Sequence, residues 1–364
     1  MTQFPKTSLR ILVKAILLFV IFNYAFVFVP DSALWQLSLY NTLLPGQTRF
    51  PLENDLNLMF DTHEISASPG RENEYKVVML GDSATWGFYL DPTETFSSVI
   101  NASNTVTCKQ KTIHLYNLGY PSLSVLKDLI ILQRAVTYRP DLIVWNITLR
   151  SMLRKSEQNN KLNVIVNNNN DIAQELIDKY GLTTQLDSGI DPVKRPSFQN
   201  KSYLARRDKI ARFINYQLNG IRWQAAGEHV DKDYPPLGMD VKADDTFDDI
   251  LPPTLHPNLL QFDVLNAGVL MAGTTPIIII NEPIQIVNGE NSGIRYNKIY
   301  PRWAYDQYRE MMTLQSEQHH WTYVDLWNVI PPTEFSNTPI HHTAKGDQIF
   351  SRTIKSIILK NACP

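Results

Sequence analysis

The sequence predicts an α/β fold in which a parallel sheet is covered by helices on both faces. Short, almost wholly apolar segments read as buried strands, and segments with the periodicity of helices separate them. Strands that are apolar along their whole length, instead of alternating, are typical of a parallel sheet buried on both faces. Five such strands are expected, over residues 74–80, 112–118, 140–147, 275–283 and 321–327.

Helices are expected between and after these strands. A short helix is predicted over 94–102, and a longer one over 122–138, where apolar residues recur at helical spacing. A terminal helix over 343–360 closes the chain. The aromatic-rich segment 300–311 resembles a carbohydrate platform, but aromatic residues at helical spacing more often belong to a core.

The segment from about 151 to 265 interrupts the alternation. Its first part, 159–171, is rich in asparagine and predicts a solvated loop. Helices are predicted over 171–182 and 206–227, and the remainder, with its proline and aspartate residues, resembles loop. We interpret this segment as an insertion beside the carboxyl edge of the sheet, which serves as a lid or as a docking surface.

The N-terminus carries a candidate membrane anchor. Residues 11–29 are nearly all apolar and span about 28 Å as a helix, which matches the bilayer core. Basic residues at 6, 10 and 14 precede or open the run, so the positive-inside rule keeps the N-terminus in the cytoplasm and puts the rest of the chain outside. A cleaved signal peptide and a buried core helix are the alternatives.

This interpretation divides the chain into an anchor over 1–30, a stalk leading into the domain over 31–72, and an α/β domain over 73–364. We expect a single-pass membrane protein. Asn23, the polar residue inside the apolar run, could contact a partner membrane protein.

Composition excludes some classes of function. The formal net charge is −2, so the chain has no basic excess that would indicate a nucleic-acid partner. Its two cysteines, Cys108 and Cys363, are too few for a zinc cluster, and they could form one disulfide or remain separate thiols. The adjacent histidines at 319 and 320 have no further ligands at metal-binding spacing, so we expect no metal.

Chemically useful side chains follow the expected strands. Because function in an open parallel sheet lies at the carboxyl ends of the strands, these side chains should share one crevice. Ser83 follows the first strand and His341 precedes the terminal helix, and a serine with a histidine base is what acyl transfer through a covalent intermediate requires. Asp82 is expected to hydrogen-bond the amides of its turn.

Asn281 and Glu282 end the fourth strand. From the sequence, Glu282 could bind substrate, hold the histidine or act as a structural cap. Trp86 could line the crevice or pack in the core, and both remain open at this stage.

Three segments of the chain resemble the sequence blocks of the SGNH (GDSL-type) hydrolases. The segments are GDSATWG (81–87), LYNLGYPS (115–122) and IHHTAKG (340–346), in the order that the family has them. The resemblance implies a flavodoxin-like three-layer sandwich without a cofactor. It also implies that Ser83 is the nucleophile and that Gly119 gives a backbone N–H to the oxyanion. His341, five residues before Gly346, would be the catalytic histidine, and His342 would not.

Two positions depart from the family pattern. The asparagine of the third block, a side-chain donor to the oxyanion, falls on Arg150, and Thr148 or Asn146 could take its place. Asn146 lies within the expected strand, where local hydrogen bonding is its more natural role. The aspartate three residues before the histidine falls on Thr338, so the imidazole would be fixed by Asn337, by Thr338 or by a main-chain carbonyl.

Together with the candidate anchor, the resemblance implies a membrane-anchored serine esterase that acts outside the cytoplasm on short acyl esters of a small molecule, a lipid or a glycan. An O-acyltransferase that modifies an envelope glycan is one alternative. A binding or assembly protein that retains the fold without catalysis is another. The two departures from the family pattern support it, and the retained Ser83, Gly119 and His341 argue against it.

Overall fold

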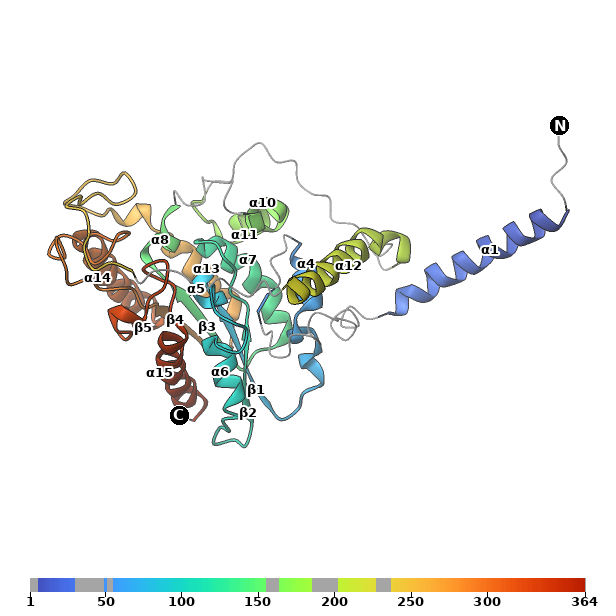
Figure 1. Ribbon diagram of the computed structural model, residues 1–364, viewed down its shortest axis with the longest axis horizontal. Helices are drawn as coiled ribbons and strands as arrows, with labels where there is room; N and C mark the ends of the chain where they lie inside the picture. Colours follow the sequence, from blue (N-terminus) through green and yellow to red (C-terminus); the bar gives the residue numbers. More distant parts are fainter. Residues whose placement is uncertain are drawn as a thin grey trace.

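The computed structural model describes residues 6–29, 49–50, 55–154, 164–184, 202–226 and 237–363. Its centre is a parallel sheet with the strand order β2-β1-β3-β4-β5, shown in Figure 1. The strands are β1 (Glu74–Leu80), β2 (Thr112–Asn117), β3 (Leu142–Ile147), β4 (Ile277–Asn281) and β5 (Thr322–Asp325). Every pair of neighbouring strands is parallel. This order is that of flavodoxin-like folds, so the predicted fold class is confirmed.

Helices cover both faces of the sheet, because successive residues of a strand point to opposite sides. In β1, Val77 and Met79 face α6 (Phe96–Ala102) and α15 (Ala344–Ala362). Val78 and Leu80 face the other core, which α7 (Val125–Ala135), α13 (Phe262–Ala272) and α14 (Arg302–His319) help to build. The sandwich therefore has three layers.

The strands are mostly a little shorter than the apolar segments that predicted them. Segment 275–283 illustrates the cause, since β4 begins only after Pro276 and ends before Pro283. A proline has no N–H to donate to the ladder, so the regular pairing stops at both positions. The aromatic-rich segment 300–311 belongs to α14, where Tyr305 and Tyr308 are fully buried, so it forms core and no carbohydrate platform.

The described part of the predicted insertion is largely helical, as expected for 171–182 and 206–227. It contains α8 (Leu149–Met152), α10 (Val164–Asn168), α11 (Asn170–Tyr180) and α12 (Tyr203–Ala226). The expectation of a solvated loop over 159–171 is wrong for the described part, since Ile165 and Val166 are buried against the main core. Residues 159–163 lie outside the described part of the chain. Helix α13, which the sequence did not predict, is the crossover helix that leads into β4.

The described part of the predicted stalk contributes to the core. Phe50 is fully buried, and α4 (Leu56–Thr62) packs Met59 and Phe60 into the same apolar cluster. Asp55 caps the first turn of α4 by accepting the N–H groups of Asn57 and Leu58. Residues 31–48 of this segment lie outside the described residues.

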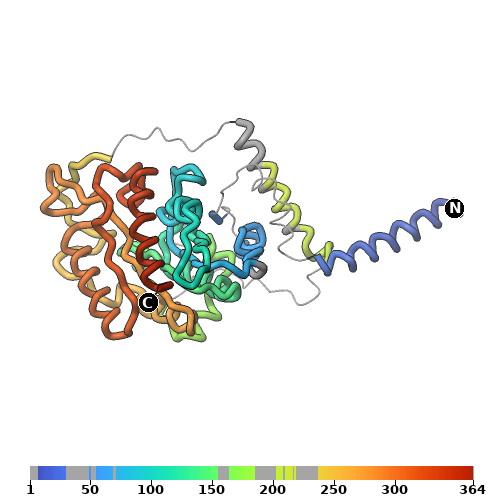
Figure 2. Tube along the Cα trace, turned by 90° about the horizontal axis from the view of Figure 1, so that it is seen from below, coloured from blue at the N-terminus to red at the C-terminus, as the bar shows by residue number. Residues whose placement is uncertain are grey.

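Helix α1 (Lys6–Ala25) extends away from the α/β body, as Figure 2 shows. The apolar stretch Thr7–Phe28 is 22 residues long; its most apolar 18-residue window has a mean hydropathy of 2.4, and none of that window is buried within the molecule. In length and composition it can cross a membrane.

Candidate active site

The candidate nucleophile lies on a tight turn between β1 and α5 (Ser83–Trp86). Asp82 caps this short helix, because its carboxylate accepts the N–H of Ala84 at 2.8 Å. Gly81 has φ +154°, and a Cβ there would lie within 3 Å of the Thr85 side chain, so the turn needs glycine. Ser83 is thereby presented at the carboxyl edge of the sheet.

The structure brings Ser83 and His341 together, although 258 residues separate them in the chain. Nε2 of His341 lies 2.7 Å from Oγ of Ser83, and Nδ1 of His341 lies 2.8 Å from Oδ1 of Asn337. An amide oxygen accepts the Nδ1–H, which leaves the Nε2 lone pair for the serine hydroxyl. The three side chains thus form a serine–histidine–asparagine chain of hydrogen bonds with the tautomer that a general base requires.

The other candidates for holding the histidine act elsewhere. Oγ1 of Thr338 accepts the backbone N–H of His341 at 3.2 Å, so Thr338 shapes the loop and does not touch the ring. His342 is turned away and buried, with its Nδ1 2.8 Å from Asp347. Asp347 also accepts the backbone N–H of Phe96, so this pair ties the histidine loop to α6.

Burial lowers the pKa of His341 to about 4, and the nearby His342 and Lys298 contribute to the same direction. Only 7% of the His341 residue surface is exposed, and Phe88 and Tyr89 lie beside the ring, with centroids 5.4 Å and 6.1 Å away. The imidazole is therefore neutral, and able to accept a proton, across the neutral and mildly acidic range.

The predicted oxyanion donors are arranged differently from the family pattern. The N–H of Gly119 donates to Oδ1 of Asn117 at 3.0 Å. A Cβ on Gly119 would come within about 2.8 Å of the Trp86 nitrogen, so this glycine allows the second loop to pack on the nucleophile turn. Among the residues that the structure describes, none accepts a hydrogen bond from the N–H of Ser83, which leaves this donor available for an oxyanion.

The residues after β3 are engaged in structural contacts. Thr148 is fully buried, and its hydroxyl lies 2.9 Å from the hydroxyl of Tyr300. Nε of Arg150 lies 3.1 Å from a carboxylate oxygen of Asp248. Their predicted role at the oxyanion remains a prediction. Asn146 donates to Oγ1 of Thr85 at 2.9 Å and so supports the nucleophile turn from within the sheet.

A buried group of charged residues lies beneath the nucleophile turn. Glu282 is hydrogen-bonded to Asp82 and not to the histidine. Burial and the neighbouring Asp82 carboxylate raise the pKa of Glu282 well above its usual range, so Glu282 holds the proton that the two carboxyl groups share. In the structure Glu282 thus contacts the nucleophile turn and not the imidazole.

Lys127 completes this buried group. Its side chain has no exposed surface, and Nζ donates to the carbonyl oxygens of Gly81, Tyr120 and Ser122 at 2.7–3.0 Å. It also pairs with Asp128 at 2.7 Å. One ammonium group therefore joins the loop that follows β1 to the loop that follows β2.

Sequence reasoning missed Lys127, although a signal was present. A lysine and an aspartate stand next to each other inside the otherwise apolar start of α7, where a solvated face is not available to both.

Two further candidates have packing roles. Asn281 donates to Asp325 at 2.8 Å and accepts from the hydroxyls of Tyr305 and Tyr308, so it links β4, β5 and α14. Trp86 is buried, with its indole N–H donating to the carbonyl oxygen of Phe50 at 2.8 Å.

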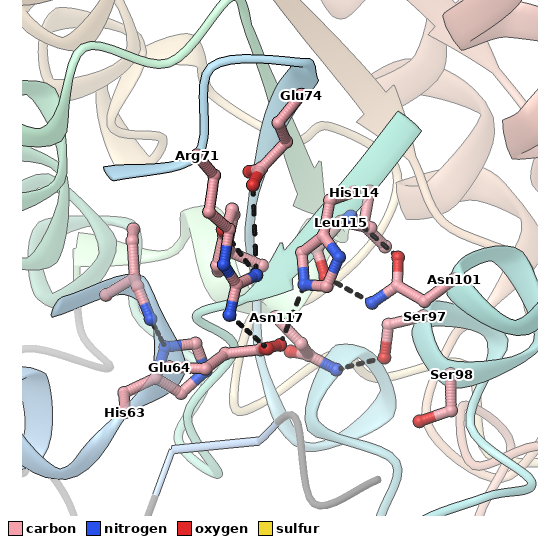
Figure 3. Close-up of polar contacts among 12 residues, drawn as sticks. His63, Glu64, Arg71, Glu74, Ser97, Ser98, Asn101, His114, Leu115 and Asn117 are labelled. Carbon is pink, nitrogen blue, oxygen red and sulfur yellow. Dashed lines mark hydrogen bonds and ion pairs between the residues drawn. The ribbon is translucent and has the colours of Figure 1, made fainter. Parts of the chain in front are cut away.

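A second polar group lies at the opposite, amino-terminal edge of the sheet, where β1 and β2 begin (Figure 3). Glu64 contacts Arg71 at 3.7 Å and His114 at 3.1 Å, and Arg71 contacts Glu74 at 3.8 Å. An open hollow of about 370 Å³ lies beside these residues. These side chains pair with one another and are separate from Ser83.

Comparisons with known proteins give a likeness of fold only. No family model and no curated protein matches the chain. Among solved structures, it is similar to a lipase/acylhydrolase from Enterococcus faecalis, with 12% identity and a TM-score of 0.37 over 78% of this chain and 96% of that chain. An acetylxylan esterase from Geobacillus stearothermophilus has 12% identity and a TM-score of 0.37, over 80% of this chain and 96% of that chain. The aryl esterase of M. smegmatis has 10% identity and a TM-score of 0.37, over 78% of this chain and 98% of that chain. At such identities and scores, these likenesses assign neither a reaction nor a substrate to this chain.

Proposed function

We propose that this protein is a membrane-anchored serine esterase that cleaves short acyl esters outside the cytoplasm. The observation that carries the proposal is the hydrogen-bonded chain from Ser83 through His341 to Asn337, at 2.7 Å and 2.8 Å. A serine hydroxyl is a weak nucleophile until a neighbouring base accepts its proton, and this geometry supplies the base. The reaction needs only side chains and water.

In the proposed mechanism, Oγ of Ser83 attacks the acyl carbonyl carbon while its proton moves to Nε2 of His341. The N–H of Ser83 donates to the oxyanion that forms. His341 then gives the proton to the leaving alcohol as the ester C–O bond breaks, which leaves an acyl group on Ser83. Water, deprotonated by the same histidine, releases the acid and restores the serine.

Asn337 has a positioning role in this mechanism. By accepting the Nδ1–H, it holds the imidazole in the orientation and tautomer that face Ser83. An amide is neutral, however, and does not stabilise the imidazolium as a carboxylate would. We therefore expect activity well below that of a site with a charged third member.

Two observations support the location outside the cytoplasm. Lys6, Arg10 and Lys14 lie in the N-terminal half of α1, ahead of its longest uncharged run, which favours a cytoplasmic N-terminus. Cys108 and Cys363 form a disulfide that joins residues 255 positions apart, and structural disulfides are typical of oxidising compartments.

The experiment treats the full-length protein in detergent with a fluorophosphonate probe, and then measures hydrolysis of p-nitrophenyl acetate. The proposal is supported if the wild type is labelled and both Ser83→Ala and His341→Ala are not. His342→Ala is the control: His342 faces Asp347 and not Ser83, so this variant should still be labelled. A folded protein that neither labels nor hydrolyses the ester would refute it and favour a binding protein. Acyl transfer to an added sugar in place of water would identify an acyltransferase.

A further inference from the structure

Helix α12 exposes an apolar face. Leu204, Ile214 and Leu218 are 45%, 50% and 56% exposed, and Ala211 between them is exposed as well. Intervals of seven, three and four residues place all four on one side of a helix. Exposed Arg207 lies on the same side, where its long side chain can reach headgroups while the apolar residues face the acyl chains. On the opposite side Phe213 and Gln217 are buried, so this side of the helix faces the body and the four apolar residues point outward.

The helix is held to the body in this orientation. Arg212 contacts the carboxylate of Asp55 at 2.6 Å. The same carboxyl group caps α4, whose apolar residues lie in the main core. The outward face of α12 is therefore a fixed surface of the α/β body.

The start of α12 also contacts the end of the candidate membrane span. The backbone N–H of Leu204 donates to Oδ1 of Asn23 at 2.9 Å, so this polar residue of the apolar run meets a helix N-terminus. The ring of Tyr203 lies between Phe22 and Phe26, at 5.3 Å and 5.6 Å. These contacts place the first turn of α12 beside the outer end of α1.

Aromatic residues mark this end of α1 as the level of the bilayer surface. Tyr24 is 74% exposed, and tyrosine and tryptophan side chains of membrane helices concentrate at the boundary between hydrocarbon and water. Figure 2 shows α12 leaving this point in a direction different from that of α1, so it does not continue through the membrane as a second span. A helix that starts at this level with an apolar outer face meets lipid before it meets water.

We propose that the outward face of α12, formed by Leu204, Ala211, Ile214 and Leu218, lies in the interfacial layer of the bilayer that α1 spans. This inference rests on the membrane anchor of the proposed function. Amphipathic helices bind bilayer surfaces by burying such a face at the boundary of headgroups and acyl chains. The protein would then contact the bilayer through both α1 and α12, and the second contact would fix the orientation of the α/β body relative to the membrane.

The test places a fluorescent probe at single positions of the full-length protein. Leu218→Cys carries the probe on α12, Ile16→Cys carries it within α1, and Leu314→Cys carries it on α14. Leu314 is 63% exposed and Ile16 is 55% exposed, so all three substitutions are at the surface and spare the core. Each labelled protein is reconstituted into vesicles of phosphatidylcholine and phosphatidylglycerol, with or without bromine on the phosphatidylcholine acyl chains.

The proposal expects bromine to quench the probes at 218 and 16 and to leave the probe at 314 unchanged. Quenching at 16 alone would overturn the α12 contact while leaving the anchor intact. No quenching at any position would overturn the anchor itself, and with it the inference. A probe at 218 that is shielded from aqueous iodide but not quenched by bromine would show that protein, such as a second copy, covers this face, and would also overturn the lipid contact.

Discussion

Asn337→Asp should raise both the pKa of His341 and the reactivity of Ser83. The pKa of the histidine is about 4 instead of the usual 6.5, which corresponds to about 3 kcal/mol against the imidazolium at about 1.4 kcal/mol per unit. Asp has nearly the shape of Asn, so its carboxylate would occupy the position of the amide, 2.8 Å from Nδ1. A carboxylate at such a distance raises a neighbouring pKa by about one to three units.

The magnitude follows from the charge that develops on the imidazole. A rise of one to three pKa units means that the carboxylate stabilises the imidazolium by between about 1.4 and 4 kcal/mol. If the transition state of acylation gains the same stabilisation, acylation should accelerate between about tenfold and a thousandfold at pH 8. The sign of the pH dependence is also fixed. The histidine must be neutral to act as a base, so activity falls as pH drops through its pKa. The acidic limb should therefore move from about pH 4 to between about pH 5 and pH 7.

The assay is the pH profile of kcat/KM for p-nitrophenyl acetate, together with the rate of fluorophosphonate labelling. Thr338→Asp is the matched control, because it introduces a carboxylate at the position that the family pattern uses. In this structure Oγ1 of Thr338 accepts the backbone N–H groups of Ile340 and His341 and does not contact the imidazole. A variant Asn337→Asp that folds normally but leaves both the rate and the acidic limb unchanged would refute the assigned geometry. So would a larger gain in Thr338→Asp.

Further predictions concern the groups that hold the site together. Lys127→Met should lower the free energy of unfolding by about 3–5 kcal/mol, because it leaves a buried carboxyl group without its partner. Lys111→Met, which removes a half-exposed ion pair with Asp141, is the control and should lower it by less than about 1 kcal/mol. Urea titration measures both variants. Glu282→Gln should react with fluorophosphonate nearly as fast as wild type, since an amide keeps the hydrogen-bond donor that a protonated carboxyl provides. If its labelling rate falls as far as that of Glu282→Ala, Glu282 is not protonated. Reduction of the disulfide between Cys108 and Cys363 should lower the free energy of unfolding by about 5 kcal/mol through the long loop that it closes, and an unchanged urea midpoint would contradict that.

The sheet was predictable from the sequence because its strands are apolar along their whole length and are bounded by polar residues or proline. Helix α13 was missed because residues 262–272 are apolar on most sides, so they lack the periodic contrast that marks an amphipathic helix. Residues 164–168 were interpreted as loop from their asparagine content, but Ile165 and Val166 find a buried position against α7. Tertiary packing decided both cases, and single-sequence patterns do not contain it.

The candidate site was predictable only for reactive side chains that stand next to the end of a predicted strand or helix. Ser83 and His341 stand at the ends of elements, and the parallel sheet brings such ends together. The partner of the imidazole was left open among three groups, because a loop of five residues does not determine which side chain reaches Nδ1; the structure selects Asn337. The hydrogen bond of Gly119 to Asn117 was not foreseen, since it depends on the side-chain direction of a neighbour two residues away.

The described carboxyl groups of the site lie beneath the nucleophile turn, and no described residue places a carboxyl group against the imidazole of His341. Burial raises the pKa of Asp128 from 3.8 to about 6 and lowers that of His341 from 6.5 to about 4. A buried acid with a raised pKa binds more protons in the folded state, so its contribution to stability grows as pH falls from about 6 to 3.8. The histidine binds more protons in the unfolded state, so its contribution is lost as pH falls from 6.5 to about 4. The two effects oppose each other in nearly the same window, so acidification costs this pair less stability than the histidine alone would lose. A carboxylate at position 337 would make the contribution of His341 to this pH dependence smaller, because it would return the pKa of the imidazole towards its ordinary value.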